Sequence, residues 1–421
     1  MAKNKKRKKV QTSHHGEISV AKPSKADLEA CHAAARRIFR LMGEDETSFD
    51  LFSKHQKQAM FRIPVAPPRV RAMPGHKVPK RYIRFIQEQF LLFLKREYFE
   101  KEIGIRWIEL FTVGQNLMLI FSSNIFLNSL PEPQRRVADN MYKAFRDKEL
   151  FPKMQDRMLA VIKTLLMMIS QPNFRIYGHY IEELRPMEYR HALQPVVYIT
   201  TNACESIRFR YHNKEHKAFR IAVGQELGTP CLGATIEMNK IYPNVSPNRT
   251  LNIYVQSHAL HRFKERIDTF FPSLRNQLLV FSLFSSQRVV NGPGGIQLFV
   301  CISPSRNEDL AIGYLPFTID GNNLFILTLL PLLSRNTPEG HVLCNRLRLS
   351  TADLKYLGMD KLSFFFEVDI EQIPVLKEIL FDELHLDYIR NKLGSMYHAK
   401  NNPFNEKKTL FVKNFFQKLE K

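Results

Sequence analysis

The residues with the clearest chemical potential lie in one short stretch, which reads SHALHRFKERI from Ser257 to Ile267. Apolar residues alternate just before it, at Leu251, Ile253 and Val255, and serine is a good helix cap, so we expect a strand that enters a helix. On a helix, side chains four positions apart share one face. The residues that this spacing brings together are His258, Arg262 and Arg266. An imidazole beside two guanidiniums can bind a phosphodiester, with the arginines neutralising charge and the histidine transferring a proton.

The elements around this helix are predicted to support that face. Leu260, Phe263 and Ile267 point away from it and are expected to enter a core. A strand predicted over Leu324 to Leu330 carries Thr328, whose hydroxyl would bind a phosphate oxygen beside the helix. The predicted site therefore combines one helix with one strand.

This order of parts resembles the small bacterial ribonuclease toxins of the barnase, EndoU, colicin and RelE superfamily. The resemblance rests on HAxxRFxxR on a helix, followed by a meander that closes with an apolar strand carrying a threonine, between Thr250 and Pro331. It implies that His258 is the acid–base residue. It also implies that Arg262 and Arg266 hold the phosphate and that Thr328 supplies the strand hydroxyl.

The chemistry of such a site would be RNA cleavage without a metal or any other cofactor. A base takes the proton of a ribose 2′-OH and that oxygen attacks the adjacent phosphorus. Arginines stabilise the charge that develops, and an acid protonates the leaving 5′ oxygen. His258 or His261 would be the base, with Glu265 as its partner. The alternative is structural, because short motifs often arise by chance. In that case Arg262 and Arg266 pair with acids on neighbouring elements, and His258 caps the helix or packs under the sheet.

Charge favours an anionic partner. The 421 residues include 62 Lys and Arg against 41 Asp and Glu, which gives a formal net charge of +21. Such an excess favours RNA or DNA before a membrane surface. The proline-rich stretch 62–84 contains no acidic residue, and we expect an extended connector that either follows a phosphate backbone or wraps its own domain. The connector residues predicted to bind nucleic acid are Arg69, Arg71, Lys77, Lys80, Arg81 and Arg84.

Other features argue against several classes of protein. The five cysteines are widely spaced, and the N-terminus has no apolar segment, so we expect neither a disulfide framework nor a secretory signal, and a cytoplasmic location. Phe111–Leu130 lacks charge but is too polar to enter lipid readily, and we expect a buried helix pair there. His212 and His216, with Cys204 and Cys231, suggest a metal site, but their spacing is irregular and we predict none.

We expect an α+β fold with a helical N-terminal domain, a central and mostly antiparallel sheet domain with one main helix, and a helical C-terminal segment. The predicted divisions are a disordered basic leader at 1–25, a helical domain at 26–185, an α+β domain at 190–345 and a helical segment with a basic tail at 346–421. The strands that the composition predicts are 194–200, 206–211, 218–223, 278–284, 296–302, 310–317 and 324–330. Lys214 is expected in a hairpin turn.

These observations support a cytoplasmic bacterial protein that interacts with nucleic acid. One hypothesis is a metal-independent endoribonuclease. A second is a nucleic-acid-binding or mobile-element accessory protein without catalysis, in which the same arginines only neutralise phosphates. A third is a scaffold that binds acidic proteins. The sequence identifies no particular protein partner.

Overall fold

The computed structural model describes residues 25–61, 65–182, 194–245, 248–270, 272–304, 309–394 and 404–419. The predicted leader at 1–25 lies outside the described residues except for Lys25. The chain divides into two compact units. Unit 1 comprises Met1–Met73, Pro79–Ile162 and Tyr180–Tyr198, and unit 2 comprises Pro74–Val78, Lys163–His179 and Ile199–Lys421.

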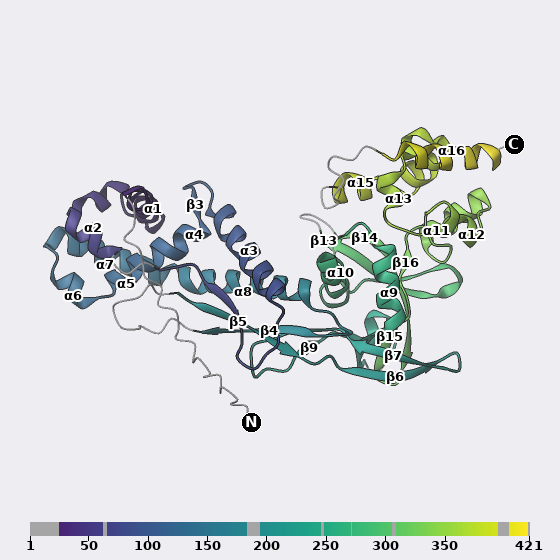
Figure 1. Ribbon diagram of the computed structural model, residues 1–421, viewed down its shortest axis with the longest axis horizontal. Helices are drawn as coiled ribbons and strands as arrows, with labels where there is room; N and C mark the ends of the chain where they lie inside the picture. The colour runs from purple at the N-terminus through teal and green to yellow at the C-terminus, as the bar shows by residue number, and fades with distance from the viewer. Residues whose placement is uncertain are drawn as a thin grey trace, which may run out of the picture. The chain divides into compact units, whose positions relative to one another are not determined.

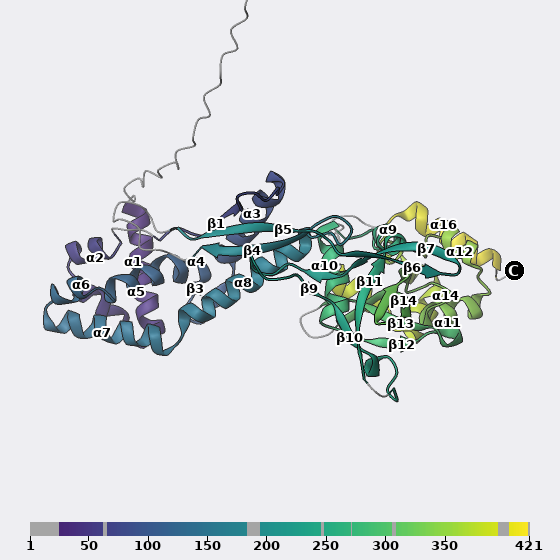
Figure 2. The ribbon, with the colours of Figure 1, turned by 90° about the horizontal axis from the view of Figure 1, so that it is seen from below.

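Unit 1 is built mainly from helices, as the sequence predicted. Its helices are α1 (Lys25–Met42), α2 (Lys54–Met60), α3 (Lys80–Arg96), α4 (Trp107–Glu109), α5 (Gln115–Phe121), α6 (Asn124–Asn128), α7 (Glu132–Asp147) and the first part of α8 (Leu150–Ile169). Figure 2 shows α1, α5, α6 and α7 gathered together. In α7 the buried residues Val137, Met141 and Phe145 recur every fourth position, which places them on one face toward the core.

The uncharged stretch Phe111–Leu130 forms helices within unit 1. It includes α5 and α6, and its residues Leu117, Phe121 and Phe126 are buried. The prediction of a helix pair is confirmed. Among the described residues, no helix has the length and apolar character needed to cross a bilayer.

The basic connector is only partly extended. Strand β1 (Arg69–Ala72) is extended, and it joins β4 (Ile176–Glu182) and β5 (Val196–Asn202) in a sheet of order β1-β5-β4. The prediction is wrong for Lys80, Arg81 and Arg84, because Pro79 caps the N-terminus of α3 and these residues begin that helix. Proline fits this position because its fixed φ suits a helix start and its missing N–H is not needed there.

Unit 2 contains a nine-stranded sheet with the strand order β12-β13-β14-β15-β11-β7-β6, in which β10 also pairs with β11 and β16 with β14. Its strands are β6 (Ser206–Tyr211), β7 (Lys214–Arg220), β10 (Thr235–Glu237), β11 (Thr250–Gln256), β12 (Val289–Asn291), β13 (Gln297–Pro304), β14 (Asp309–Asp320), β15 (Asn323–Ile326) and β16 (Leu330–Pro331). The pairs within it are antiparallel except for β11 with β15, which is parallel. Two short strands, β8 (Ala222–Val223) and β9 (Leu232–Gly233), pair separately, as do β2 (Tyr98–Glu100) and β3 (Ile105–Arg106) of unit 1.

Two helices follow β11 in succession, α9 (Ser257–Arg266) and α10 (Pro272–Phe284). Figure 1 shows α9 beside β7 and α10 beside β13. The strand predicted over 278–284 is therefore wrong, because that apolar run is the second half of α10. A short continuous apolar run has no distinguishing period, so helix and strand cannot be separated by pattern. Here the Ser282 hydroxyl donates to the Leu278 carbonyl, four residues earlier in the same helix, at 2.7 Å.

The C-terminal segment is helical, as predicted, and shares the core of the sheet. Its helices are α11 (Pro338–Leu347), α12 (Thr351–Tyr356), α13 (Phe364–Glu367), α14 (Pro374–Lys377), α15 (Asp387–Leu393) and α16 (Glu406–Leu419). One cluster of buried residues includes Ile253 of β11, Phe263 of α9, Leu343 of α11 and Phe416 of α16. The molecule thus has the α+β architecture that the sequence predicted.

The hairpin between β6 and β7 differs from the prediction at its turn. Lys214 does not lie in the turn but pairs with Tyr211 as the first residue of β7. The two turn residues are His212 and Asn213, whose φ angles are 47° and 60°. Positive φ at both central residues is typical of the two-residue turns that match the twist of a hairpin.

Candidate functional site

The motif helix is positioned by the strand before it. β11 is buried at Ile253 and Val255, and α9 begins directly at Ser257 with Gln256 in the N-cap position. Ala259, Leu260 and Phe263 of α9 are buried against the sheet. The predicted strand-to-helix geometry is confirmed, although the side chain of Ser257 does not cap the helix.

The α9 face, which we define as His258, Arg262, Glu265 and Arg266, is held mainly by contacts within the helix. Arg262 donates from Nε to His258 Nε2 at 3.4 Å and from Nη1 to Glu265 Oε2 at 2.9 Å. His261 Nε2 lies 2.9 Å from the other oxygen of Glu265. One carboxylate thus holds a guanidinium and an imidazole, and the partner of Arg262 is on its own helix.

His258 is exposed, so it does not pack under the sheet. The pKa of its imidazole lies below the usual 6.5 because partial burial disfavours the charged form and the positive charges of Arg262, His261 and Arg266 repel a proton. A neutral ring agrees with Nε2 as the acceptor of the Arg262 hydrogen bond. At neutral pH His258 therefore has the protonation state of a base.

Arg266 points to a different partner from Arg262. Its guanidinium donates from Nη1 to the backbone carbonyl of Leu329. The Leu329 side chain is fully buried, and the Arg266 Nε is buried without a partner among the described residues. Arg266 thus anchors the end of α9 to the segment 327–329.

Thr328 lies in that same segment, which is not a strand. β15 ends at Ile326 and β16 begins at Leu330, so the predicted continuous strand over 324–330 is wrong. The neighbouring strand β14 contains Pro316, which accepts a hydrogen bond from Leu327 N at 2.9 Å but has no N–H to continue the ladder. The Arg266–Leu329 contact brings the backbone beside Thr328 to α9, and Thr328 itself is partly exposed.

The predicted connector residues are accessible but do not all belong to one unit. Arg69, Lys77, Lys80, Arg81 and Arg84 are exposed and Arg71 is partly exposed. Lys77 belongs to unit 2, whereas the others belong to unit 1. Their role in binding nucleic acid stays a prediction.

The histidine and cysteine residues considered for a metal do not form a metal site. His212 lies in the hairpin turn and His216 in β7. Within the described ranges, no group of three or more His, Cys, Asp or Glu side chains could hold a metal ion. The five cysteines, Cys31, Cys204, Cys231, Cys301 and Cys344, are free thiols.

One face of the β6–β7 hairpin is basic, a feature that the sequence analysis missed. The register pairs Arg208 with Lys217 and Arg210 with Glu215, and all four side chains are exposed on the same face. We call these four residues the basic hairpin face. Arg208 contacts Glu215 at 3.0 Å. In the part of the chain that the structure describes, Arg210 and Lys217 have no ion-pair partner.

The opposite face of the hairpin is apolar and fixes its position. Phe209 of β6 stacks on Phe325 of β15 with ring centroids 3.9 Å apart, and Tyr254 of β11 stacks on the same ring at 5.7 Å. These residues form a small core with Ala218. The alternation of Arg208 and Arg210 with Phe209 and Tyr211 was the sequence signal for this two-faced ribbon.

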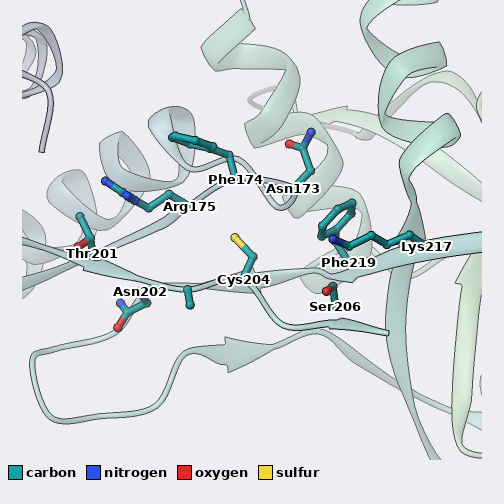
Figure 3. Close-up of a pocket in the computed structure, with 10 residues that line it drawn as sticks. Asn173, Phe174, Arg175, Thr201, Asn202, Cys204, Ser206, Lys217 and Phe219 are labelled. Atoms are coloured by element: carbon teal, nitrogen blue, oxygen red, sulfur yellow. The ribbon is translucent and has the colours of Figure 1, made fainter. Parts of the chain in front are cut away.

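The basic hairpin face leads into a pocket of about 430 Å³. We call it the Phe174 pocket, and its lining residues are Asn173, Phe174, Arg175, Thr201, Asn202, Ala203, Cys204, Ser206, Lys217 and Phe219. Figure 3 shows residues 173–175 on one side of it and 201–206 on the other, with Lys217 and Phe219 at one end. The lining holds two cations and no acid. Residue spacing did not predict this pocket because its lining comes from a turn at 173–175 and from the separate residues 201–206 and 217–219, which only the fold brings together.

The chain matches no model of a known protein family, no curated protein and no solved structure.

Proposed function

We propose that this protein binds nucleic acid through the basic hairpin face. The observation that carries the proposal is a rigid ribbon that displays Arg208, Arg210 and Lys217 against a single acid, Glu215. Phosphate backbones attract such surfaces because binding releases condensed counterions. A two-stranded ribbon also has dimensions that a nucleic-acid groove can admit.

Two further features support this proposal. The net charge of +21 provides long-range attraction for a polyanion. The small core beneath the ribbon, in which Phe209 stacks on Phe325, fixes the backbone that carries the cations before binding. A preformed surface loses less conformational entropy when it binds.

Removal of two hairpin cations should weaken binding. We expect R208A/R210A to lower affinity roughly three- to tenfold and to reduce the dependence of affinity on salt by between about one and two phosphate contacts, because Glu215 partly neutralises Arg208. The measurement is fluorescence anisotropy with labelled RNA and DNA, each as a single strand of roughly 20 nucleotides and as a duplex, over a series of salt concentrations.

The matched control is K355A/K361A, which removes two exposed cations of the same unit outside the hairpin. The control should bind almost as the parent protein does. Equal losses in both variants would show that net charge alone matters and would overturn the role of the hairpin. A parent protein that binds no nucleic acid, or whose affinity is independent of salt, would overturn the function itself.

A second candidate function is RNA cleavage at the α9 face, without a metal ion. It is favoured by His258, which is exposed and has a lowered pKa beside Arg262. His258 would take the proton of a ribose 2′-OH, and Arg262 would stabilise the charge on the phosphorus oxygens as the 2′ oxygen attacks. The P–O5′ bond would then break, and the protonated His258 or water would return a proton to the leaving 5′ oxygen. Because Arg262 donates to His258 Nε2, it must first turn toward the phosphate to release that nitrogen.

The test is cleavage of a labelled RNA in the presence of a metal chelator. We expect H258A to be roughly a hundredfold slower or more than the parent. The control is H341A, which removes an exposed histidine of α11 whose partner is Asn345. Equal rates for H258A and the parent would remove this candidate, and so would a parent that leaves RNA intact.

A further inference from the structure

The Phe174 pocket presents an aromatic ring to solvent from a tight turn. The side chain of Phe174 is 66% exposed. Among the described residues of unit 2, it is the most exposed phenylalanine. The turn is closed by hydrogen bonds from Phe174 N and Arg175 N to the Gln171 carbonyl, and from Gln171 N back to the Arg175 carbonyl, all at 2.9 Å. The ring is therefore held at the rim of the pocket by its backbone.

Two cations line the pocket, and each lies near an aromatic ring. The Arg175 guanidinium lies 5.4 Å from the Phe174 ring centroid and donates one hydrogen bond to the Lys77 carbonyl at 2.7 Å. The Lys217 ammonium lies 5.0 Å from the Phe219 ring. Among the described residues no carboxylate lines the pocket, so neither charge is neutralised within this lining. An anionic ligand fits this pocket better than a neutral or cationic one.

Some polar groups of the lining already have hydrogen-bond partners within the protein, and others can bind a ligand. Thr201 has such a partner, because its N–H and its hydroxyl both contact His76 Nδ1, at 2.9 and 3.2 Å. Cys204 directs its thiol to the Gln171 carbonyl at 3.4 Å, and burial raises the pKa of that thiol, so it stays protonated at neutral pH. The side-chain amides of Asn173 and Asn202 lie in the same lining (Figure 3) and offer both donors and acceptors.

We infer that the Phe174 pocket takes one unstacked nucleotide of a single-stranded nucleic acid. The base stacks on Phe174, the flanking phosphates contact Arg175 and Lys217, and one lining amide, that of Asn173 or that of Asn202, contacts the edge of the base. The pocket volume lies within the range of small-ligand sites. Because the pocket shares Lys217 with the basic hairpin face, a strand that enters it continues along the hairpin.

The inference rests on the proposed function and adds a preference for single strands to it. A duplex keeps its bases stacked inside, so placing one base on Phe174 requires the free energy of unpairing and unstacking that base. The basic hairpin face binds phosphates of either form. Loss of the ring should therefore affect one form of nucleic acid and spare the other.

The experiment measures anisotropy of labelled oligonucleotides with F174A and F174L. We expect both variants to bind single strands roughly tenfold more weakly and duplexes as the parent does, because base–aromatic stacking is lost. Single-stranded RNA and DNA are measured separately, so that a contribution from the ribose 2′-OH appears as a difference between them. The control is Y356A, which removes a 64% exposed aromatic side chain of α12.

The outcomes separate the two proposals. If F174A and F174L bind single strands as the parent does while R208A/R210A is weakened, the pocket inference is wrong and the proposed function stands. If the single-strand and duplex affinities of F174A fall equally, the ring does not distinguish them and the inference is also wrong. If the parent binds no nucleic acid, the proposed function fails and the pocket inference fails with it.

Discussion

The α9 face and the basic hairpin face carry the same kinds of side chain but use them differently. On α9, Arg262 is paired with Glu265, and Arg266 donates to the Leu329 carbonyl. On the hairpin, Arg210 and Lys217 have no ion-pair partner within the described part of the chain. The first surface satisfies both of its guanidiniums within the protein, whereas the second pairs only Arg208, with Glu215, and leaves Arg210 and Lys217 to solvent.

This difference shows why a motif of basic residues does not by itself define a binding surface. A guanidinium that faces a carboxylate contributes little net field, and its release requires the carboxylate to be solvated again. An unpaired cation on a rigid strand carries neither restriction. We therefore expect the hairpin to bind phosphate more strongly than the helix, although the helix has the more recognisable sequence.

The largest effect is expected at Arg266, where the comparison predicts a structural role. R266M removes the donor to the buried Leu329 segment and should lower the free energy of unfolding by about 1–3 kcal/mol. Urea denaturation measures this change, with R210M as a control that should unfold as the parent does. An R266M protein of parental stability that loses RNA cleavage would instead assign Arg266 to the α9 chemistry.

A smaller effect should separate Arg210 from Arg262 in nucleic-acid binding. R210A should weaken binding roughly two- to threefold and reduce the salt dependence by about one phosphate contact. R262A should change neither quantity, because Glu265 already neutralises that guanidinium. Both are measured by the same anisotropy titrations over salt. If R262A weakens binding as much as R210A does, pairing with a carboxylate does not distinguish the two surfaces.

The sequence predicted those parts of the fold whose periodicity is distinctive. β11 followed by α9 was predictable because alternation at Leu251, Ile253 and Val255 changes to helical spacing at one point. The run over 278–284 was not, because continuous apolar residues suit both a buried strand and a buried helix. Thr328 left its predicted strand because Pro316 on the partner strand cannot donate to the ladder.

The candidate site was less predictable than the fold because it depends on tertiary partners. Spacing alone placed His258 and Arg262 together, since both lie on one helix. Spacing could not show that Arg266 bonds to the Leu329 carbonyl, which is far away in the sequence. The Phe174 pocket is lined by three separate segments. For the basic hairpin face beside it, the alternation of residues within β6 was the one indication in the sequence.

The smallest effect concerns the hairpin turn, whose geometry orients the basic face. His212 and Asn213 adopt positive φ, and a turn with positive φ at both central residues is most favourable for the dipeptide Asn-Gly. H212N/N213G should therefore slow amide hydrogen exchange in β6 and β7, with a stabilisation of about 0.5 kcal/mol. H212V should speed exchange, because a β-branched side chain is strained at positive φ.

Nucleic-acid affinity connects this turn to the comparison of the two surfaces. If rigidity of the ribbon matters for binding, H212N/N213G should bind slightly more tightly than the parent and H212V slightly more weakly, while RNA cleavage at α9 stays the same in both. Opposite changes in exchange and affinity would show that the ribbon binds by adapting its shape. In that case the hairpin would differ from α9 in backbone mobility as well as in the number of unpaired cations.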